Sequence, residues 1–219
     1  MRLIDKYRPR RLEQVVGQDA AVRTLLGVID RKGFSGGAFW IDGRTGVGKT
    51  TIAQCIARRL GIKSPMAWNW LELDGERCRI DEVRALSDQA NLSSMFPDWR
   101  IVIVNEAHAM TDKSVQAWLT LLDRLPDRWV VVFTTTEVGG LFGNFDAPLL
   151  DRCLHVSLTN QGLSGPFAHL AHRIAGREGL NGQPVAAYQA RLRKRHNSMR
   201  ALLQDIENGY FSDNSGAKQ

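Results

Sequence analysis

The residues with the clearest chemical meaning lie at positions 43–50, where the sequence reads Gly-Arg-Thr-Gly-Val-Gly-Lys-Thr. This run matches the pattern GxxxxGK[ST], in which backbone N–H groups and the positive end of the following helix converge on phosphate oxygens. Lys49 would neutralise phosphate charge and the Thr50 hydroxyl would bind Mg²⁺. A glycine-rich turn that only closes a strand would require neither side chain, so the run predicts a nucleotide site. Its predicted nucleotide-binding residues are Thr45, Gly46, Val47, Gly48, Lys49, Thr50 and Thr51.

A second group follows the apolar segment 101–104, where the sequence continues Asn105-Glu106-Ala107-His108. ATPases with this kind of phosphate loop usually have Asp-Glu here. Asn105 offers Mg²⁺ only a neutral carbonyl oxygen, so we expect weaker metal binding and hydrolysis. Glu106 is predicted to orient or deprotonate the attacking water; the alternative is a strand-end charge with no chemical role. We interpret His108, on the turn, as structural.

Short apolar segments at regular intervals predict the strands that position these groups. We expect five, at residues 38–41, 70–73, 101–104, 129–133 and 154–158. The third and fourth are apolar on both faces, which is typical of strands covered by helices on each side, so the sheet should be mostly parallel. Residues 50–60 and 111–125 show amphipathic helical spacing, the second with Thr111 as its N-cap. The fold class is therefore α/β.

The pattern after residue 158 is helical throughout. Ser164 and Pro166 open a helix that Gly179 closes, Pro184 opens a second, and Asn197 is predicted to cap a third. We therefore expect an α/β nucleotide-binding domain at residues 1–158, a small all-helical lid at 159–210 and a disordered tail at 211–219.

The composition limits the class of protein. The chain has 219 residues, 43% hydrophobic and 24% charged, which excludes collagen-like, disulfide-scaffold and wholly disordered chains. A net charge of +6 favours anionic partners such as nucleotides or nucleic acid. Three widely spaced cysteines without a CxxC pair favour a reduced compartment, and neither a signal peptide nor a membrane span is predicted. We expect a cytoplasmic protein with no membrane partner.

Read together, these motifs resemble the AAA+ ATPases of the DNA clamp loader family, which includes the replication factor C small subunits and the bacterial DNA polymerase III gamma/tau subunit. The resemblance covers residues 6–207. The opening Lys-Tyr-Arg-Pro-Arg at 6–10 and Val-Val-Gly-Gln at 15–18 are similar to the family's adenine-binding box. The resemblance places these residues beside the base: Tyr7, Arg8, Pro9, Val16 and Gly17.

Three further residues receive roles from the resemblance. Thr136 matches the sensor-1 residue that responds to the γ-phosphate, with a polar strand end as the alternative. Arg152 matches the arginine finger that reaches a neighbouring subunit's site, with a salt bridge at the strand start as the alternative. Arg200, in Asn-Ser-Met-Arg at 197–200, matches sensor 2, which contacts the nucleotide phosphates. The segment 71–75 and the charged stretch 80–84 are similar to a strand and a helix that follow DNA phosphates in the family.

The sequence also departs from the family pattern. Asn105 stands in place of aspartate, Asp151 in place of the serine before the finger, and residues 139–145 lengthen the segment before the finger. The zinc module of the bacterial members is absent. The family's third, collar domain would begin where the printed sequence stops, so we expect either a truncated chain or a compact member that assembles through AAA+ contacts alone.

The leading hypothesis is an oligomeric clamp-loader-like ATPase, with ATP and Mg²⁺ as cofactors, that loads or remodels a partner protein on DNA. Its expected partners are other AAA+ subunits in a homo- or hetero-oligomer with Arg152 acting in trans, DNA through backbone contacts, and a sliding clamp or other replication protein. The basic run 191–196 is a phosphate contact or, more simply, a solvated face. The alternatives are a nucleotide-binding scaffold with little hydrolysis, a helicase-loader or transposition-type protein, and a small P-loop kinase.

Overall fold

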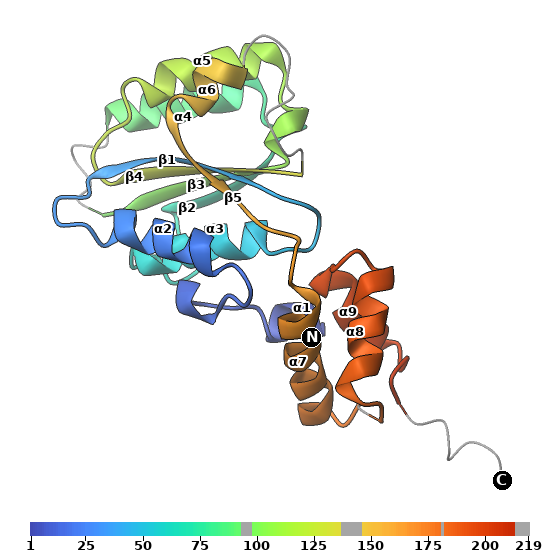
Figure 1. Ribbon diagram of the computed structural model, residues 1–219. Coiled ribbons are helices and arrows are strands. Elements are labelled where there is room, and N and C mark those ends of the chain that lie inside the picture. Colours follow the sequence, from blue (N-terminus) through green and yellow to red (C-terminus); the bar gives the residue numbers. More distant parts are fainter. Residues whose placement is uncertain (93–97, 137–145, 181, 213–219) are drawn as a thin grey trace.

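The structure is a computed structural model that describes residues 1–92, 98–136, 146–180 and 182–212. Figure 1 shows a helix-covered sheet, with a group of helices that extends from one corner of it. The predicted α/β class is confirmed. No helix among the described residues is long and apolar enough to cross a bilayer.

The described part of the chain forms one five-stranded sheet. The strands are β1 (Gly36–Asp42), β2 (Trp70–Asp74), β3 (Arg100–Asn105), β4 (Trp129–Thr135) and β5 (Cys153–Ser157). Their order is β2-β3-β4-β1-β5, and every neighbouring pair is parallel. Because all strands run the same way, their carboxyl ends meet at one edge of the sheet, where Asp42 is in register with Thr135.

Helices cover both faces of the sheet. They are α2 (Asp19–Ile29), α3 (Lys49–Arg59), α4 (Ile80–Asn91), α5 (Asp112–Leu122) and α6 (Asp146–Leu150). Figure 1 shows α2 and α3 on one face and α4, α5 and α6 on the other. Along β3, Ile101 and Ile103 are buried on the first face, and Val102 and Val104 on the second. Each such side chain contributes about 1.5–3 kcal/mol of burial free energy, which explains why this strand is apolar throughout.

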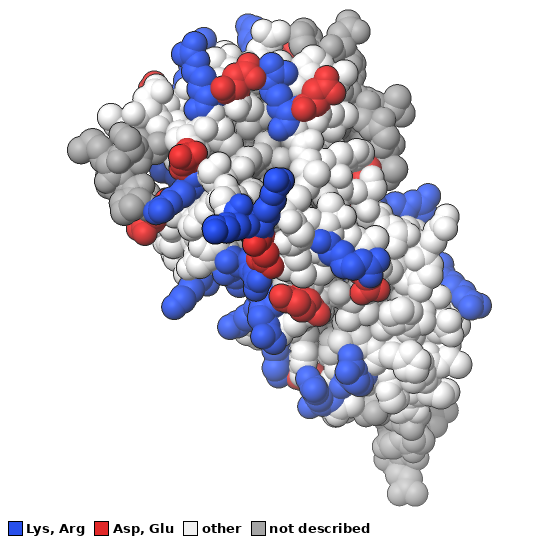
Figure 2. Space-filling model, turned by 60° about the vertical axis from the view of Figure 1, so that its left-hand side comes forward, with Lys and Arg blue, Asp and Glu red and all other residues white. Residues whose placement is uncertain are grey.

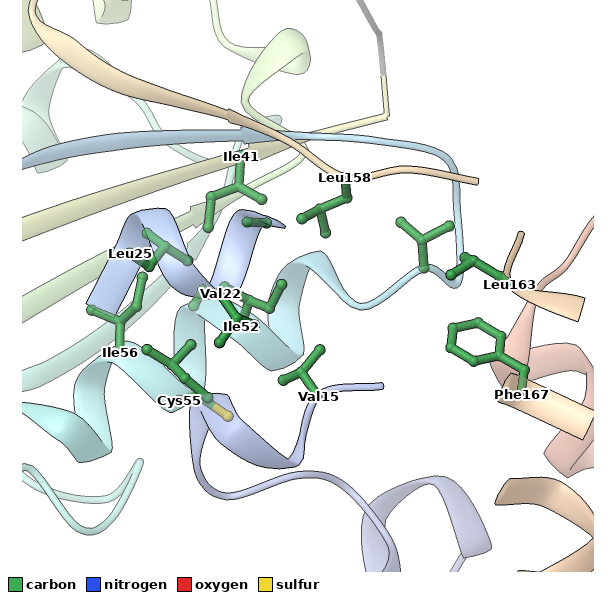
Figure 3. Close-up of a cluster of buried hydrophobic side chains, with 14 of the residues drawn as sticks. Val15, Val22, Leu25, Ile41, Ile52, Cys55, Ile56, Leu158, Leu163 and Phe167 are labelled. Carbon is green, nitrogen blue, oxygen red and sulfur yellow. The ribbon is translucent and has the colours of Figure 1, made fainter. Parts of the chain in front are cut away.

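The remaining helices lie beyond the sheet. They are α1 (Leu3–Lys6) and, after β5, α7 (Ser164–Arg177), α8 (Val185–Lys194) and α9 (Met199–Glu207); two short 3₁₀ helices are η1 (Leu12–Gln14) and η3 (Ala107–Ala109). We call α7, α8 and α9 the lid. Figure 3 shows that the apolar cluster under the sheet continues through Leu158 to Leu163 and Phe167 of the lid. The core and the lid therefore share apolar contacts on this side.

Two predicted helix ends differ from those in the structure. Helix α5 has the predicted N-cap, Thr111, but ends at Leu122 rather than at residue 125. Leu125 itself precedes Pro126, where helical backbone is disfavoured. The prediction that Asn197 caps the last helix is wrong. Asn197 has a left-handed φ of 59°, and Ser198 is the cap, its Oγ accepting a hydrogen bond from the Ala201 N–H at 3.3 Å.

Other expectations about the helices are confirmed. Pro184 is the N-cap of α8, and Gly179 follows the C-cap of α7 with a φ of +69°, as a terminating glycine should. The residues predicted to lengthen the segment before Arg152, 139–145, lie outside the described residues. The domain boundaries at residues 158 and 210 stay predictions.

Candidate functional site

A pocket opens at the carboxyl edge of the sheet, between the core and the lid. One part of its wall is polar and comes from the loop after β1, the end of β3 and the start of α9: Thr45, Gly46, Val47, Gly48, Lys49, Thr50, Thr51, Glu106 and Arg200. The other part is mainly apolar and comes from the N-terminal segment and the lid: Ile4, Tyr7, Arg8, Pro9, Val15, Val16, Phe167, Leu170, Ile174, Met199 and Leu203. The pocket thus combines a polar end and an apolar end, as a nucleotide requires.

The loop between β1 and α3 bends through glycines with positive φ. Gly46 has a φ of +82°, and a Cβ built on it would lie 2.2 Å from the Ser198 Oγ. The Met199 N–H, at the start of α9, donates a hydrogen bond to the Gly46 carbonyl at 3.3 Å. Only glycine fits this approach, so the lid rests directly on the phosphate loop.

Lys49 is the first residue of α3 and is 6% exposed. Its Nζ donates hydrogen bonds to the carbonyls of Gly43, at 2.7 Å, and Arg44, at 3.2 Å. Burial lowers the pKa of Lys49; Glu106 opposes this shift, whereas the positive charge of Arg200 adds to it. Two cations that disfavour each other within one pocket, at a helix N-terminus, make a place where an anion with several charges is stabilised.

Asn105 ends β3 beside two hydroxyl groups. Its Oδ1 accepts hydrogen bonds from Thr50 Oγ1 at 3.0 Å and from Thr134 Oγ1 at 3.2 Å. Hydroxyl and amide oxygens are ligands that suit Mg²⁺, so Thr50 and Asn105 fit the ion in donor type. Both are neutral, however, and an ordinary Mg²⁺ site has at least one carboxylate.

Glu106 has an uncommon backbone, with φ at 49° and ψ at 49°. Its Oε2 accepts a hydrogen bond from Thr136 Oγ1 at 3.1 Å and lies 3.5 Å from Nδ1 of His108. Gly75 permits this conformation, because a Cβ there would lie 2.2 Å from the Glu106 carbonyl oxygen. Thr136 and Glu106, predicted from separate motifs, are therefore brought together. His108 also contacts Thr135, at 3.1 Å, and sequence reasoning missed its place beside Glu106.

Four of the five residues assigned to the base meet at the apolar end of the pocket. Tyr7, Arg8, Pro9 and Val16 line it, but Gly17 does not. A Cβ on Gly17 would lie 2.5 Å from Leu163 Cδ2, so this glycine instead permits close packing against the lid.

Sequence reasoning missed Gln18, which is 2% exposed. Its Oε1 accepts a hydrogen bond from the Thr159 N–H at 3.1 Å, and its Nε2 donates to the Thr159 carbonyl at 2.9 Å and to the Val47 carbonyl at 3.4 Å. One side chain therefore fixes the phosphate loop to the start of the core–lid connection. Because its partner Thr159 lies 141 residues away, the sequence around Gln18 carries no local signal of this role.

Arg152 lies at the opposite edge of the sheet from the pocket. Its Nε donates to Asp123 Oδ1 at 2.6 Å and its second terminal nitrogen to Oδ2 at 3.1 Å. The neighbouring Cys153 is in register with Ala38, whereas Ser157, at the carboxyl edge, is in register with Asp42. Four residues of strand correspond to about 13 Å, so Arg152 lies well away from the pocket of its own chain.

Two arginines of the basic run 191–196, at the end of α8, bind a carboxylate within the lid. Asp205, 5% exposed, accepts hydrogen bonds from Arg191 Nε at 2.7 Å and from Arg195 at 2.6 and 3.0 Å. Arg193 and Lys194, between them, are exposed. The run therefore combines a structural ion pair with two solvated cations.

Comparison with known proteins places these features in a family. The model of the ATPase family associated with various cellular activities (AAA) matches residues 40–160. DNA polymerase III subunit gamma/tau of Mycoplasma pneumoniae is 29% identical over 170 residues, 69% of this chain and 24% of that protein. Replication factor C large subunit of Methanocella arvoryzae is 26% identical over 210 residues, 93% of this chain and 35% of that protein. The resemblance to clamp loader subunits is thereby confirmed, and this chain spans a minor part of each of these two relatives.

Solved structures show the same fold. RuvB of Thermotoga maritima, a Holliday junction branch migration motor, superposes with a TM-score of 0.70 at 18% identity, over 91% of this chain and 64% of that one. A point variant of the same protein gives a TM-score of 0.71 at 16% identity, with the same coverage. At this identity the likeness concerns the arrangement of sheet and helices alone.

Proposed function

The chain belongs to the ATPase family associated with various cellular activities, and on that premise we propose that it is a clamp-loader-like ATPase that works in an oligomer on DNA. The observation that carries the proposal is the pocket that Lys49, Glu106 and Arg200 all line. The relatives with matching sequences are DNA polymerase III and replication factor C subunits, which supports a role in DNA replication. The proposed place of action is the cytoplasm.

Five side chains of the pocket, together with Thr136 beside it, have roles in the proposed reaction. Lys49 and Arg200 bind the phosphates of ATP, and Tyr7 and Val16 lie beside the adenine. Glu106, oriented by Thr136, accepts a proton from the water that attacks the γ-phosphate. We assign to Thr136 a response to the terminal phosphate through this hydrogen bond to Glu106.

Thr50 and Asn105 would hold Mg²⁺, which supplies charge neutralisation for the phosphates when it is bound. Their oxygens are 3.0 Å apart and carry no formal charge. The protein's contribution is therefore the placement of two neutral oxygens rather than a full negative charge.

The position of Arg152 supports an oligomer. Its side chain is at the amino edge of the sheet, so we assign it to the pocket of a neighbouring subunit, where it would stabilise charge that develops on the transferred phosphoryl group. An arginine at the amino edge and a pocket at the carboxyl edge give a head-to-tail arrangement of subunits.

DNA is proposed to bind through its phosphate backbone. On the face shown in Figure 2, Lys and Arg side chains spread from the core to the lid in small groups, with acidic side chains among them. This mixed distribution fits phosphate contacts distributed over several subunits and does not resemble one continuous basic stripe. A sliding clamp or other replication protein is the proposed partner to be loaded.

Steady-state ATP hydrolysis with and without primed DNA tests the proposal. We expect the wild type to turn over ATP faster with DNA, and Glu106→Gln to lower turnover about 100-fold or more while ATP still binds. If wild type and Glu106→Gln are equally inactive and both bind ATP, the proposed motor function is wrong.

That last outcome would support a second function, a nucleotide-binding scaffold that hydrolyses little ATP. The neutral Asn105, already hydrogen-bonded by two threonines, is the observation in its favour. Asn105→Asp then separates the two functions. In a scaffold limited by metal binding, this substitution should raise turnover at least about tenfold and lower the Mg²⁺ concentration needed for half-maximal turnover. If Asn105→Asp does not raise turnover, metal binding at this position does not limit ATP hydrolysis.

A further inference from the structure

The N-terminal segment, residues 2–9, crosses the apolar end of the pocket. At one end its helix α1 packs against α9 of the lid, with Leu3 buried and the Leu3 N–H hydrogen-bonded to Glu207. Figure 1 shows α1 beside the lid and away from the sheet. The first residues of the chain therefore belong to the lid side of the pocket.

Glu178, the C-cap of α7, makes the polar part of this attachment. Its carboxylate accepts hydrogen bonds from Lys6 Nζ at 2.7 and 2.9 Å and from the Tyr7 hydroxyl. The Lys6 ammonium and the Tyr7 hydroxyl lower the pKa of Glu178, and the bond to Glu178 raises the pKa of Tyr7. At neutral pH the tyrosine is thus a neutral donor to a charged carboxylate, an arrangement stronger than a neutral hydrogen bond.

The next residues are attached to the core instead. Arg8 donates a hydrogen bond to Thr51 Oγ1 of α3 at 3.4 Å, and the Cys55 thiol, also on α3, donates to the Pro9 carbonyl at 3.4 Å. Tyr7 and Pro9 both line the pocket, yet one is held by the lid and the other by α3. The shape of this pocket wall consequently depends on where the lid lies relative to α3.

From this arrangement we infer that Glu178 is a positioning residue for the base of the nucleotide: it holds Tyr7 in the pocket wall and makes affinity for the base depend on the position of the lid. The inference rests on the proposed ATP-binding function. Glu178 itself does not line the pocket, so it acts through Tyr7 and Lys6. The phosphate end is built mainly by the loop after β1, and it meets the lid through the Met199–Gly46 hydrogen bond at the start of α9 rather than through the contacts of Glu178. We therefore expect this end to change less than the apolar end when Glu178 is replaced.

This difference between the two ends provides the test. ATP occupies both ends of the pocket, whereas inorganic tripolyphosphate has no base and occupies the phosphate end alone. We expect Glu178→Gln to weaken ATP binding about five- to tenfold in calorimetric titrations and to leave tripolyphosphate binding within about twofold, both at one Mg²⁺ concentration. Tyr7→Phe should weaken ATP similarly, and the double variant should be no weaker than Glu178→Gln alone, because the Tyr7–Glu178 contact that Tyr7→Phe removes is already altered in Glu178→Gln.

Glu13→Gln is the matched control. It removes the same charge from a surface ion pair with Arg59, outside the pocket. It should change the affinity for neither ATP nor tripolyphosphate. Thermal unfolding of each variant checks that the lid is intact.

Equal weakening of ATP and tripolyphosphate in Glu178→Gln, or unchanged ATP binding in both Glu178→Gln and Tyr7→Phe, would overturn the inference and leave the proposed function standing. A wild type that binds neither ligand would overturn the proposed function, and this inference with it.

Discussion

The two edges of the sheet differ in the partners of their positively charged side chains. At the carboxyl edge, the buried Lys49 donates its hydrogen bonds to backbone carbonyls, and Arg200 lowers its pKa further. At the amino edge, Arg152 forms a two-pronged ion pair with Asp123, whose hydrogen bond raises the pKa of the arginine. One edge concentrates positive charge on a pocket, and the other keeps its cation neutralised at the surface.

This difference is compatible with the proposed oligomer, in which one chain would supply the pocket and its neighbour the arginine. The pocket is formed within the chain, because its phosphate loop, Glu106 and Arg200 converge without help from another subunit. Arg152 contributes nothing to that pocket, and its exposed ion pair is the weak kind that solvent and salt screen. In the proposed oligomer, an arginine held in this way would exchange Asp123 for a more highly charged phosphate at little cost.

The strongest test of this comparison is the removal of the buried charge at the carboxyl edge. Lys49→Ala should weaken ATP binding at least about 100-fold, equivalent to ~2.7 kcal/mol, and abolish turnover, because no other lysine among the described residues lines the pocket. Titration calorimetry and a steady-state ATPase assay measure the two effects. Lys63→Ala, at an exposed position after α3, is the control and should be silent. If Lys49→Ala keeps its affinity for ATP, the carboxyl edge of the sheet is not the phosphate site.

Arg152→Ala should have the next largest effect, and on turnover alone. We expect a loss of about 1,000-fold in turnover, with ATP affinity changed less than about threefold, because the side chain lies far from its own pocket. Mixing Arg152→Ala with Lys49→Ala should restore part of the turnover, since one chain supplies the pocket and the other the arginine.

Arg124, which follows Asp123 in the sequence, is also exposed, and Arg124→Ala is the matched control for Arg152→Ala. A mixture that stays as inactive as its two components would show that Arg152 does not act on a partner, and would favour the simpler interpretation of a local salt bridge with Asp123.

The smallest effect is expected from Asp123→Asn, which leaves Arg152 in place without its carboxylate. Turnover should rise about twofold, because the arginine no longer has to leave an ion pair, and the melting temperature should move by no more than about 2 °C, as for most exposed ion pairs. Differential scanning fluorimetry and the same ATPase assay measure both. A fall in turnover as large as that of Arg152→Ala would mean that Asp123 holds the arginine in its working position.

Much of the fold follows from the sequence, because the relevant signals are local. The all-apolar runs in β3 and β4 predict strands covered on both faces, and Thr111 is the N-cap that its side chain predicts. Where two capping residues are adjacent, as with Asn197 and Ser198, the sequence cannot choose between them. The choice depends on Asn197, whose Nδ2 instead donates to the Asn160 carbonyl at 2.9 Å, a contact between the lid and the connection that precedes it.

The site was predictable where a motif keeps its residues close in sequence, and less so where the fold brings distant residues together. The phosphate loop, Glu106 and Arg200 line one pocket, as expected from their motifs. Gln18 and Glu178 have no such local signal: their partners lie 141 and 171 residues away, across the core–lid connection and the N-terminal segment. Gly17 shows the converse, since its motif predicted a base contact and the fold uses it for packing against Leu163.

The absence of a side chain at Gly46 has a mechanical consequence. A methyl carbon there would lie 2.2 Å from the Ser198 Oγ, so the loop and the lid meet without room for one more carbon atom. Gly46→Ala would therefore force the start of α9 away from the phosphate loop and strain the hydrogen bond from the Met199 N–H to the Gly46 carbonyl. The close contact between lid and loop thus tolerates no side chain at position 46.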